Sequence, residues 1–444
     1  MKRLLQKKTT QSQYDMPYSL YKYKNGMQVL YIQIKPSSKL VYIKFYTRVG
    51  EMMESQKKDM EIAHFLEHLV CAFTSSKYPS AKDNIDALDK RGAQVNASTT
   101  QYYTDYYILG NKKVIPFFMD LIGNAFIDFK IDPEIFKQEK QSVMEELRNL
   151  QSDIWNPFEE ELNKLLYPNH PISWTFAQRI KNTAKLTPKA VENYYHENYG
   201  TNNTLLVIAS SLHIDEMEKY ALPFLKRKKY IKTPQPTPYP IVFNNLSEPK
   251  YFFYLTPAAT AYNIIFIYSS NIGAFNKYAD ILPLLCMILT GDFSSLLVKR
   301  LRTEEGLVYG VNCDIEDDEY FQTASKFKIS TTCKKKNVKK VIKIILECME
   351  TICDNTFNQN AMTRLHNNIN TQFLHANTDH SLDRFASHYG YYALYNQQIQ
   401  PQQFLKIYQR KMKFTPQQLC SVAQKIFNPK NLIIAVSGNK QINL

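Results

Sequence analysis

The chain has 444 residues, and its 55 Lys and Arg residues exceed its 41 Asp and Glu residues to give a formal net charge of +14. This length suffices for about two to four domains, each with a hydrophobic core of its own, and a hydrophobic fraction of 44% excludes a wholly disordered chain. No run approaches the ~18 apolar residues of a membrane-spanning helix. Seven scattered Cys residues argue against a disulfide framework. The excess of positive charge leaves an anionic partner open.

Residues 1–15 form a basic tail that is rich in Gln, Ser and Thr, with Asp15 as its first acidic residue. Leu4 and Leu5 are its one apolar pair, far short of the apolar core of about 7–15 residues in a secretory signal. We therefore expect a disordered tail and a protein that is not secreted. A cytoplasmic location, in its own cell or in a host cell, is favoured over import into an organelle.

Strand-like and helical patterns alternate along both halves of the chain. Residues 40–45 form an apolar run typical of a strand, and residues 136–150 have the periodicity of a long helix. Past the middle of the chain, residues 264–268 again predict a strand and residues 338–352 a helix. This alternation predicts mixed α+β domains.

One segment of the first half recurs 228 residues later in the second. Thr187-Pro188 and Thr415-Pro416 each predict the start of a helix, because Thr can cap a helix and Pro is tolerated at its first position. Each predicted helix is followed by an Asn-containing turn and an apolar strand, at residues 205–209 and 432–436. The repeat indicates two related domains.

The repeat and the composition together predict the domain organisation. After the tail, we expect one domain at residues 16–225 and a homologous domain at residues 251–444. Residues 226–250 between them are basic and contain Pro at alternate positions, which disfavours regular structure and stiffens the chain. This segment is predicted to be an extended linker.

The most informative motif is Ala-His-Phe-Leu-Glu-His-Leu at residues 63–69. On a helix, His64, Glu67 and His68 share one face. Two imidazoles one turn apart can chelate a zinc ion, and the carboxylate beside them can accept a proton from metal-bound water. The order H-x-x-E-H is the inverted zinc-peptidase motif. The alternative is a helix whose two histidines face solvent or the core without a metal.

A catalytic zinc site needs a third protein ligand, and the predicted helix at residues 136–150 offers acidic candidates. Glu139 and Glu146 are seven residues apart and therefore lie on one face, whereas Glu145 points about 100° away. We expect Glu146 to be the third ligand. Glu139 is expected to orient a ligand or to help hold the water. Without the histidine motif, these acids would indicate only a solvated helix face.

Taken together, these motifs closely resemble the pitrilysin/insulinase family of zinc metallopeptidases, in its two-domain form typified by mitochondrial processing peptidase. The resemblance spans roughly residues 20–440 and includes matching motifs in both halves. Beyond the histidine motif and the acidic helix, the matching segments are residues 77–79, 92–99, 104–106, 170–171, 291–296 and 301–309.

The resemblance implies an α+β fold of two homologous mixed α/β domains that form a clamshell around a chamber. It implies one Zn²⁺ per chain, bound by His64, His68 and Glu146, with Glu67 activating the water. Residues 94–99 would form an edge strand to which a substrate adds as a further strand, main chain to main chain. Within that strand, Asn96 and Ala97 are the expected substrate contacts.

The second half contributes the substrate-facing residues that the resemblance implies. Arg302 and Tyr309 match an Arg and a Tyr that contact the bound substrate and donate to its carbonyl groups. Because this chain carries both the metal motif and this pair, the resemblance implies an active monomer or a homodimer. Two features depart from the family pattern: Glu61 replaces a usual Gly, and residues 72–75 lack one. We expect Cys71 to be a buried structural thiol.

We therefore expect a zinc-dependent metalloendopeptidase that acts on peptides or unfolded protein segments, without a specific nucleic-acid or membrane partner. One alternative is a non-catalytic scaffold or partner subunit of the same fold. The other is nucleic-acid binding, suggested by the net charge. The Lys-rich residues 334–340 lack interleaved aromatic residues and indicate a solvated helix start.

Overall fold

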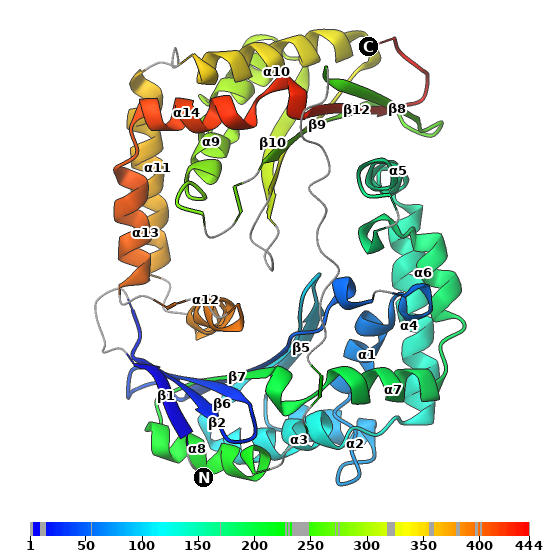
Figure 1. The fold of residues 1–444 in the computed structure, drawn as a ribbon, viewed down its shortest axis with the longest axis vertical. Coiled ribbons are helices and arrows are strands. Elements are labelled where there is room, and N and C mark those ends of the chain that lie inside the picture. Colours follow the sequence, from blue (N-terminus) through cyan, green and yellow to red (C-terminus); the bar gives the residue numbers. More distant parts are fainter. Residues whose placement is uncertain are drawn as a thin grey trace. The chain divides into compact units, whose positions relative to one another are not determined.

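The structure, a computed structural model, describes residues 3–8, 15–54, 56–168, 170–226, 229, 231–232, 248–270, 272–273, 276–317, 325–354, 359–378, 382–395, 398–399 and 402–443. The chain divides into two compact units, each drawn from three stretches of sequence (Figure 1). The first unit contains Met1–Leu150, Trp174–Thr237 and Asp379–Phe404. The second contains Gln151–Ser173, Pro238–Thr378 and Leu405–Leu444. Among the described helices, none is long and apolar enough to cross a membrane.

The first unit is built on a seven-stranded sheet in the order β1-β2-β3-β7-β4-β6-β5. All neighbouring strands are antiparallel except β3 and β7, which are parallel. The strands are β1 (Arg3–Lys8), β2 (Tyr18–Tyr23), β3 (Gln28–Gln33), β4 (Leu40–Thr47), β5 (Gln94–Thr99), β6 (Thr104–Asn111) and β7 (Thr204–Ser210). β5 lies at the edge, as predicted. The predicted disordered tail is wrong in part, because β1 lies within it and pairs with β2.

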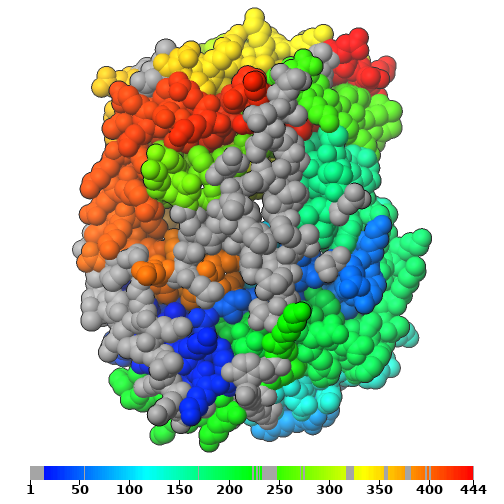
Figure 2. All heavy atoms as spheres, in the orientation of Figure 1, coloured from blue at the N-terminus to red at the C-terminus, as the bar shows by residue number. Residues whose placement is uncertain are grey.

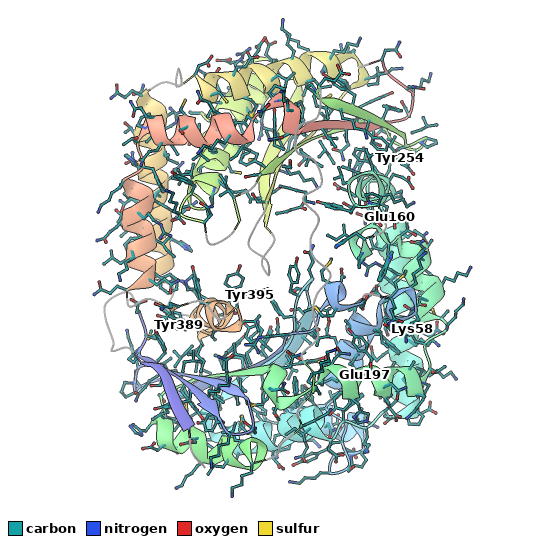
Figure 3. All side chains as sticks on the ribbon, viewed as in Figure 1. Lys58, Glu160, Glu197, Tyr254, Tyr389 and Tyr395 are labelled. Carbon is teal, nitrogen blue, oxygen red and sulfur yellow. The ribbon has the colours of Figure 1, made fainter. Side chains whose placement is uncertain are left out.

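Helices cover both faces of this sheet. One face is covered by α12 (Leu382–Leu394), which carries Tyr389 (Figure 3). Phe385 and Tyr389 of this helix pack against Tyr46 of β4 and Val207 of β7. Gly390 permits this approach, since a Cβ atom there would lie 2.9 Å from the Tyr46 ring. The other α-helices described in this unit are α1 (Ile62–Cys71), α2 (Ala81–Asp89), α3 (Ile115–Ile127), α4 (Pro133–Ser152), α6 (Phe176–Thr183), α7 (Pro188–Asn198) and α8 (Ile214–Leu225).

The opposite face of the first sheet packs against α3. Phe126 of this helix has its ring centroid 5.0 Å from that of Phe45 on β4 and 5.7 Å from that of Tyr106 on β6. α1 lies next to β5 and β6. The edge of the sheet therefore adjoins the helix that carries the predicted histidine motif.

The second unit is built on a five-stranded sheet in the order β10-β11-β9-β12-β8. Only β12 and β8 are parallel. The strands are β8 (Lys250–Leu255), β9 (Tyr262–Ser270), β10 (Val308–Asp317), β11 (Ser325–Cys333) and β12 (Leu432–Gly438). The described helices are α5 (Asn156–Leu166), α9 (Ile281–Thr290), α10 (Val338–Cys353), α11 (Gln359–Thr378), α13 (Gln403–Met412) and α14 (Pro416–Ile426), with a π-helix at Val298–Glu304.

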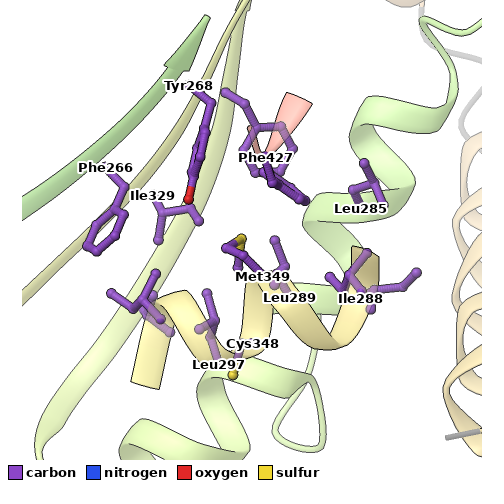
Figure 4. Packing of buried hydrophobic residues seen from close by; sticks show 14 of the residues in the cluster. Phe266, Tyr268, Leu285, Ile288, Leu289, Leu297, Ile329, Cys348, Met349 and Phe427 are labelled. Atoms are coloured by element: carbon purple, nitrogen blue, oxygen red, sulfur yellow. The ribbon is translucent and has the colours of Figure 1, made fainter. Parts of the chain in front are cut away.

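The core of the second unit lies between one face of its sheet and the helices α9, α10 and α14. Leu285 and Leu289 of α9 and Met349 of α10 belong to one buried cluster with Phe266 and Ile329 of the sheet (Figure 4). α14 lies on the surface in Figure 2, where it is coloured red-orange, and its apolar side belongs to the same cluster. On the other face of the sheet, Phe158 of α5 stacks on Phe252 of β8 at 6.3 Å.

The repeat predicted from the sequence appears in the topology. Thr187 accepts from the N–H of Ala190 to cap α7, and Thr415 accepts from the N–H of Gln418 to cap α14. The following strands, β7 and β12, each pair with one parallel neighbour, β3 or β8, and one antiparallel neighbour, β4 or β9. The two sheets are therefore related as the sequence repeat predicts.

Two helices pack in the unit opposite to their place in the sequence. α5 precedes the linker but packs in the second unit, and α12 follows it but packs in the first. Each supplies apolar residues to a sheet face: α5 to the second sheet and α12 to the first. The predicted extended linker, residues 226–250, falls mostly outside the described residues.

Candidate metal centre

The histidine motif lies on α1, as predicted, and the burial of this helix decides which side chains are available. Its apolar residues Phe65, Leu66, Leu69 and Val70 are buried, which leaves the histidine face toward a cavity. The start of the helix is capped by Glu54, whose carboxylate accepts from the N–H groups of residues 61 and 63 at 2.9 and 2.8 Å. The histidine face is thus held by a buried helix with a fixed start.

The predicted ligands meet at one point. The Nε2 atoms of His64 and His68 are 3.2 Å apart. Oε2 of Glu146, on α4, lies 3.5 Å from His64 Nε2 and 3.7 Å from His68 Nε2. In a tetrahedral zinc site with bonds of about 2.0–2.1 Å, ligand atoms lie roughly 3.3–3.4 Å apart. The two nitrogens and the oxygen therefore have the chemistry and the spacing that a zinc ion requires.

Each histidine contacts a carboxylate behind it. His68 Nδ1 is 2.8 Å from Oε2 of Glu139, the residue predicted for this place, and His64 Nδ1 is 2.7 Å from Oε1 of Glu61. When Nδ1–H donates to a carboxylate, the lone pair of Nε2 is left for a metal. In both rings Nδ1 lies on a carboxylate and Nε2 lies at the meeting point.

Sequence reasoning noted Glu61 only as a departure from the family pattern. Its side chain is buried and contacts both His64 and Arg179. Burial acts to raise the pKa of Glu61, but the hydrogen bond from His64 and the charge of Arg179 outweigh it and lower the pKa to about 2. The available signal was that departure itself, since Glu61 lies before the first residue of α1 and helical spacing does not describe its contact.

Glu67 lies on the same face and has a separate partner. Its Oε2 accepts from Oγ1 of Thr99 at 2.8 Å, and its side chain is buried. Burial raises the pKa of Glu67 above its ordinary value, which makes this carboxylate a stronger proton acceptor. Thr99, at the end of β5, was not singled out from the sequence.

A cavity of about 570 Å³ opens beside these groups, entirely within the first unit. Its lining includes the metal-ligand set, Glu67 and Glu139, residues 96–99 of β5, and the apolar side chains of Ile85 and Ile135. Asn96 and Ala97 are paired on one side with β6, and Asn96 Oδ1 accepts from the N–H of Ala97. The predicted substrate strand thus borders the cavity, and the side chain of Asn96 occupies the main-chain N–H of Ala97.

Cys71 also lines this cavity and is half-buried rather than fully buried. Burial, followed by the charges of Glu67 and Glu139, raises the pKa of its thiol to about 12. The thiol is therefore neutral at physiological pH. Among the described residues, the ligand atoms that converge are those of His64, His68 and Glu146, and Cys71 is not one of them.

Arg302 and Tyr309 lie together in the second unit. The Arg302 guanidinium is 5.0 Å from the centroid of the Tyr309 ring and 5.1 Å from that of Phe293. Both rings are largely exposed, at 85% and 69%. This arrangement holds a cation between two aromatic faces. Sequence reasoning missed Phe293, although it lies within the matched segment 291–296.

Two family models match the chain. The model described as Insulinase (Peptidase family M16) matches residues 29–179, and the model described as Peptidase M16 inactive domain matches residues 185–369. The metal-ligand set lies within the first match and the Arg302–Tyr309 pair within the second.

Curated relatives include peptidases from bacteria and mitochondria. The uncharacterized zinc protease YmxG of Bacillus subtilis is 24% identical over 66% of this chain and 68% of its own length. The mitochondrial-processing peptidase subunit beta of Saccharomyces cerevisiae is 22% identical over 48% of this chain and 45% of its own length. The chain thus spans less than half of that subunit.

Solved structures share the fold. A protease from Helicobacter pylori superposes with a TM-score of 0.80 and 17% identity, over 95% of this chain and all of that one. Pitrilysin superposes with a TM-score of 0.75 and 19% identity, over 98% of this chain and 46% of its own. These similarities establish a mixed α/β architecture of two domains.

Proposed function

Because the chain belongs to peptidase family M16, we propose that it is a zinc-dependent metalloendopeptidase that hydrolyses peptides or unfolded protein segments. The observation that carries this proposal is the meeting of His64 Nε2, His68 Nε2 and Glu146 Oε2 beside the buried carboxylate of Glu67. These three ligand atoms would hold one zinc ion per chain and leave a fourth position for water.

The residues around the ligands support a hydrolytic mechanism. When bound, a zinc ion supplies Lewis acidity that lowers the pKa of water and polarises a carbonyl group. Glu67 accepts the proton of the attacking water and returns it to the nitrogen of the leaving amine. The hydrogen bond from Thr99 fixes the Glu67 carboxylate in the cavity. Glu139 keeps His68 oriented through Nδ1.

The edge of β5 supports an extended substrate. Among the described strands, β5 pairs only with β6, so its other edge is available for main-chain pairing beside the cavity. When a substrate strand pairs at Asn96 and Ala97, the N–H of Ala97 donates to a main-chain carbonyl group of the substrate instead of to Oδ1 of Asn96. In this proposal Arg302 and Tyr309 donate to substrate carbonyl groups. Pairing of this kind selects peptides and unfolded segments over folded proteins.

The proposal is tested by comparing the parent with Glu67→Gln for zinc content and peptide cleavage. Gln keeps the size of the side chain but cannot accept the proton, so cleavage should fall at least about 100-fold. Zinc content should stay at about one ion per chain, because Glu67 is not a ligand. A parent that binds no zinc, or equal cleavage by both proteins, would contradict the mechanism. Zinc binding without cleavage by the parent would favour the non-catalytic alternative.

A further inference from the structure

The residue immediately before α1 has an unusual backbone conformation. Glu61 has φ 70° and ψ 5°, in the left-handed region where a side chain meets the following carbonyl group. Glycine occupies this region without that conflict. A Glu held there indicates that its side chain makes contacts that compensate for the backbone conformation.

The carboxylate of Glu61 joins two buried partners. Oε1 lies 2.7 Å from His64 Nδ1, and Oε2 accepts from Nη1 of Arg179 at 2.6 Å. Arg179 belongs to α6, and its side chain is only 10% exposed, while that of Glu61 is 2% exposed. Each carboxylate oxygen therefore has one partner, and the guanidinium fixes the orientation of the carboxylate.

Given the zinc site of the proposed function, we propose that Glu61, anchored by Arg179, is a positioning residue that orients the metal ligand His64. With Nδ1–H donating to Glu61, the Nε2 lone pair of His64 points to the place where His68 and Glu146 converge. The side chain of Glu61 lies over the first turn of the helix that this residue precedes, where it meets His64.

This role matches the contact on the second histidine. Glu139 approaches Nδ1 of His68 at 2.8 Å from α4, a different element. The two ligands thus receive the same kind of support from two directions, one local and one from a distant part of the chain. Partners of this kind typically change metal affinity about 10- to 100-fold.

A purely structural ion pair between Glu61 and Arg179 is the competing explanation, and zinc affinity separates the two. The zinc dissociation constant is measured by competition with a chelator for the parent and Glu61→Gly, and the thermal stability of each metal-free protein is recorded. We expect Glu61→Gly to bind zinc about 10- to 100-fold more weakly. A structural role would change the stability of the metal-free protein and leave the affinity of the folded protein unchanged.

Two further variants make the comparison specific. Glu61→Gln removes the charge but keeps an oxygen that can accept from His64, so we expect an intermediate loss of roughly three- to tenfold. If the glycine variant does not fold, Glu61→Gln alone tests the inference. Unchanged zinc affinity in Glu61→Gln would then overturn it. Glu51→Gln is the matched control, since Glu51 lies 3.4 Å from Arg179 and the structure shows no contact between it and His64. We expect its zinc affinity to equal that of the parent.

The outcomes distinguish this inference from the function on which it rests. If the parent binds zinc and cleaves peptides while both Glu61 variants keep the parent's affinity, the role of Glu61 is wrong and the peptidase proposal stands. If the parent binds no zinc, both are wrong. Equal weakening by Glu51→Gln and Glu61→Gly would also overturn the inference, because the effect would then follow from disturbing Arg179 alone.

Discussion

At the residue scale, adjacent carboxylates on α4 have different surroundings. Glu146 points at both histidines, whereas Glu145 accepts from Arg148 at 2.6 Å on an exposed part of the helix. We expect Glu146→Gln to weaken zinc binding by at least about 100-fold, because it removes a charged ligand. Glu145→Gln should leave it unchanged. Metal analysis after dialysis against a mild chelator measures the zinc retained by each variant. Loss of zinc from Glu145→Gln but not from Glu146→Gln would show that Glu145 is the third ligand.

Two nearby arginines allow a similar comparison in the second unit. Arg302 lies between Phe293 and Tyr309, whereas Arg300 donates to Glu347 at 3.0 Å. If Arg302 contacts the substrate, Arg302→Ala should lower kcat/KM for peptide cleavage about 10- to 100-fold and leave zinc content intact. Arg300→Ala, which removes a partly exposed ion pair, should keep both near the parent's values. Loss of zinc from Arg302→Ala would contradict its assignment to the substrate.

The predictability of the site depends on how local each contact is. Helical periodicity alone placed His64 and His68 on one face and chose Glu146 over its neighbour, since these relations follow from 3.6 residues per turn. Glu61 could not be assigned in this way, because its contact depends on a left-handed residue before the helix. Thr99 was missed because its contact with Glu67 requires the approach of a strand to a helix.

At the element scale, local sequence patterns predicted several of the strands and helices. The Thr-Pro pairs begin α7 and α14, as predicted from the pattern. The strand at residues 94–99, which the family resemblance implied, has the same bounds in the structure. The positions of α5 and α12 could not be predicted. An amphipathic pattern shows that a helix has an apolar face, but it does not identify the sheet that this face covers.

α12 also carries a half-buried histidine, His388, whose lowered pKa predicts that stability depends on pH. The His388 ring stacks on Phe404 with centroids 4.4 Å apart. Burial, followed by the charge of Arg384, lowers its pKa to about 4 from an ordinary value of about 6.5. Between these values the unfolded chain binds a proton that the folded chain does not. The free energy of unfolding therefore falls as the pH drops, by up to about 3 kcal/mol.

Substitution of this histidine tests the effect. On going from neutral pH to about pH 4.5, we expect the Tm of His388→Gln to fall less than the Tm of the parent does, by roughly 3–5 °C. His213→Gln is the control, because His213 is exposed, and it should follow the parent. A pH dependence equal to the parent's in His388→Gln would show that this histidine is not neutral in the folded protein.

At the scale of the whole molecule, the net charge of the chain is positive, whereas the charged residues described along the cavity are acidic. The chain carries a formal charge of +14. The described residues that line the cavity nevertheless include Glu67, Glu139 and Glu146 and neither Lys nor Arg. Forces on an approaching peptide at long range depend on the total charge, whereas contacts within the cavity depend on its lining. The excess of positive charge therefore affects the rate at which a peptide meets the protein. The acidic lining affects the binding of the metal ion and the hydrolysis step.

This separation predicts how salt affects cleavage. Peptides that share one cleaved sequence but carry acidic, neutral or basic ends are compared from about 0.02 M to about 0.5 M salt, over which the screening length falls severalfold. We expect kcat/KM to decrease severalfold for the acidic peptide, to change little for the neutral one and to increase for the basic one, because salt screens attraction and repulsion alike. Zinc content at each salt concentration is the control. The same response from all three peptides would show that the total charge does not direct substrate encounter.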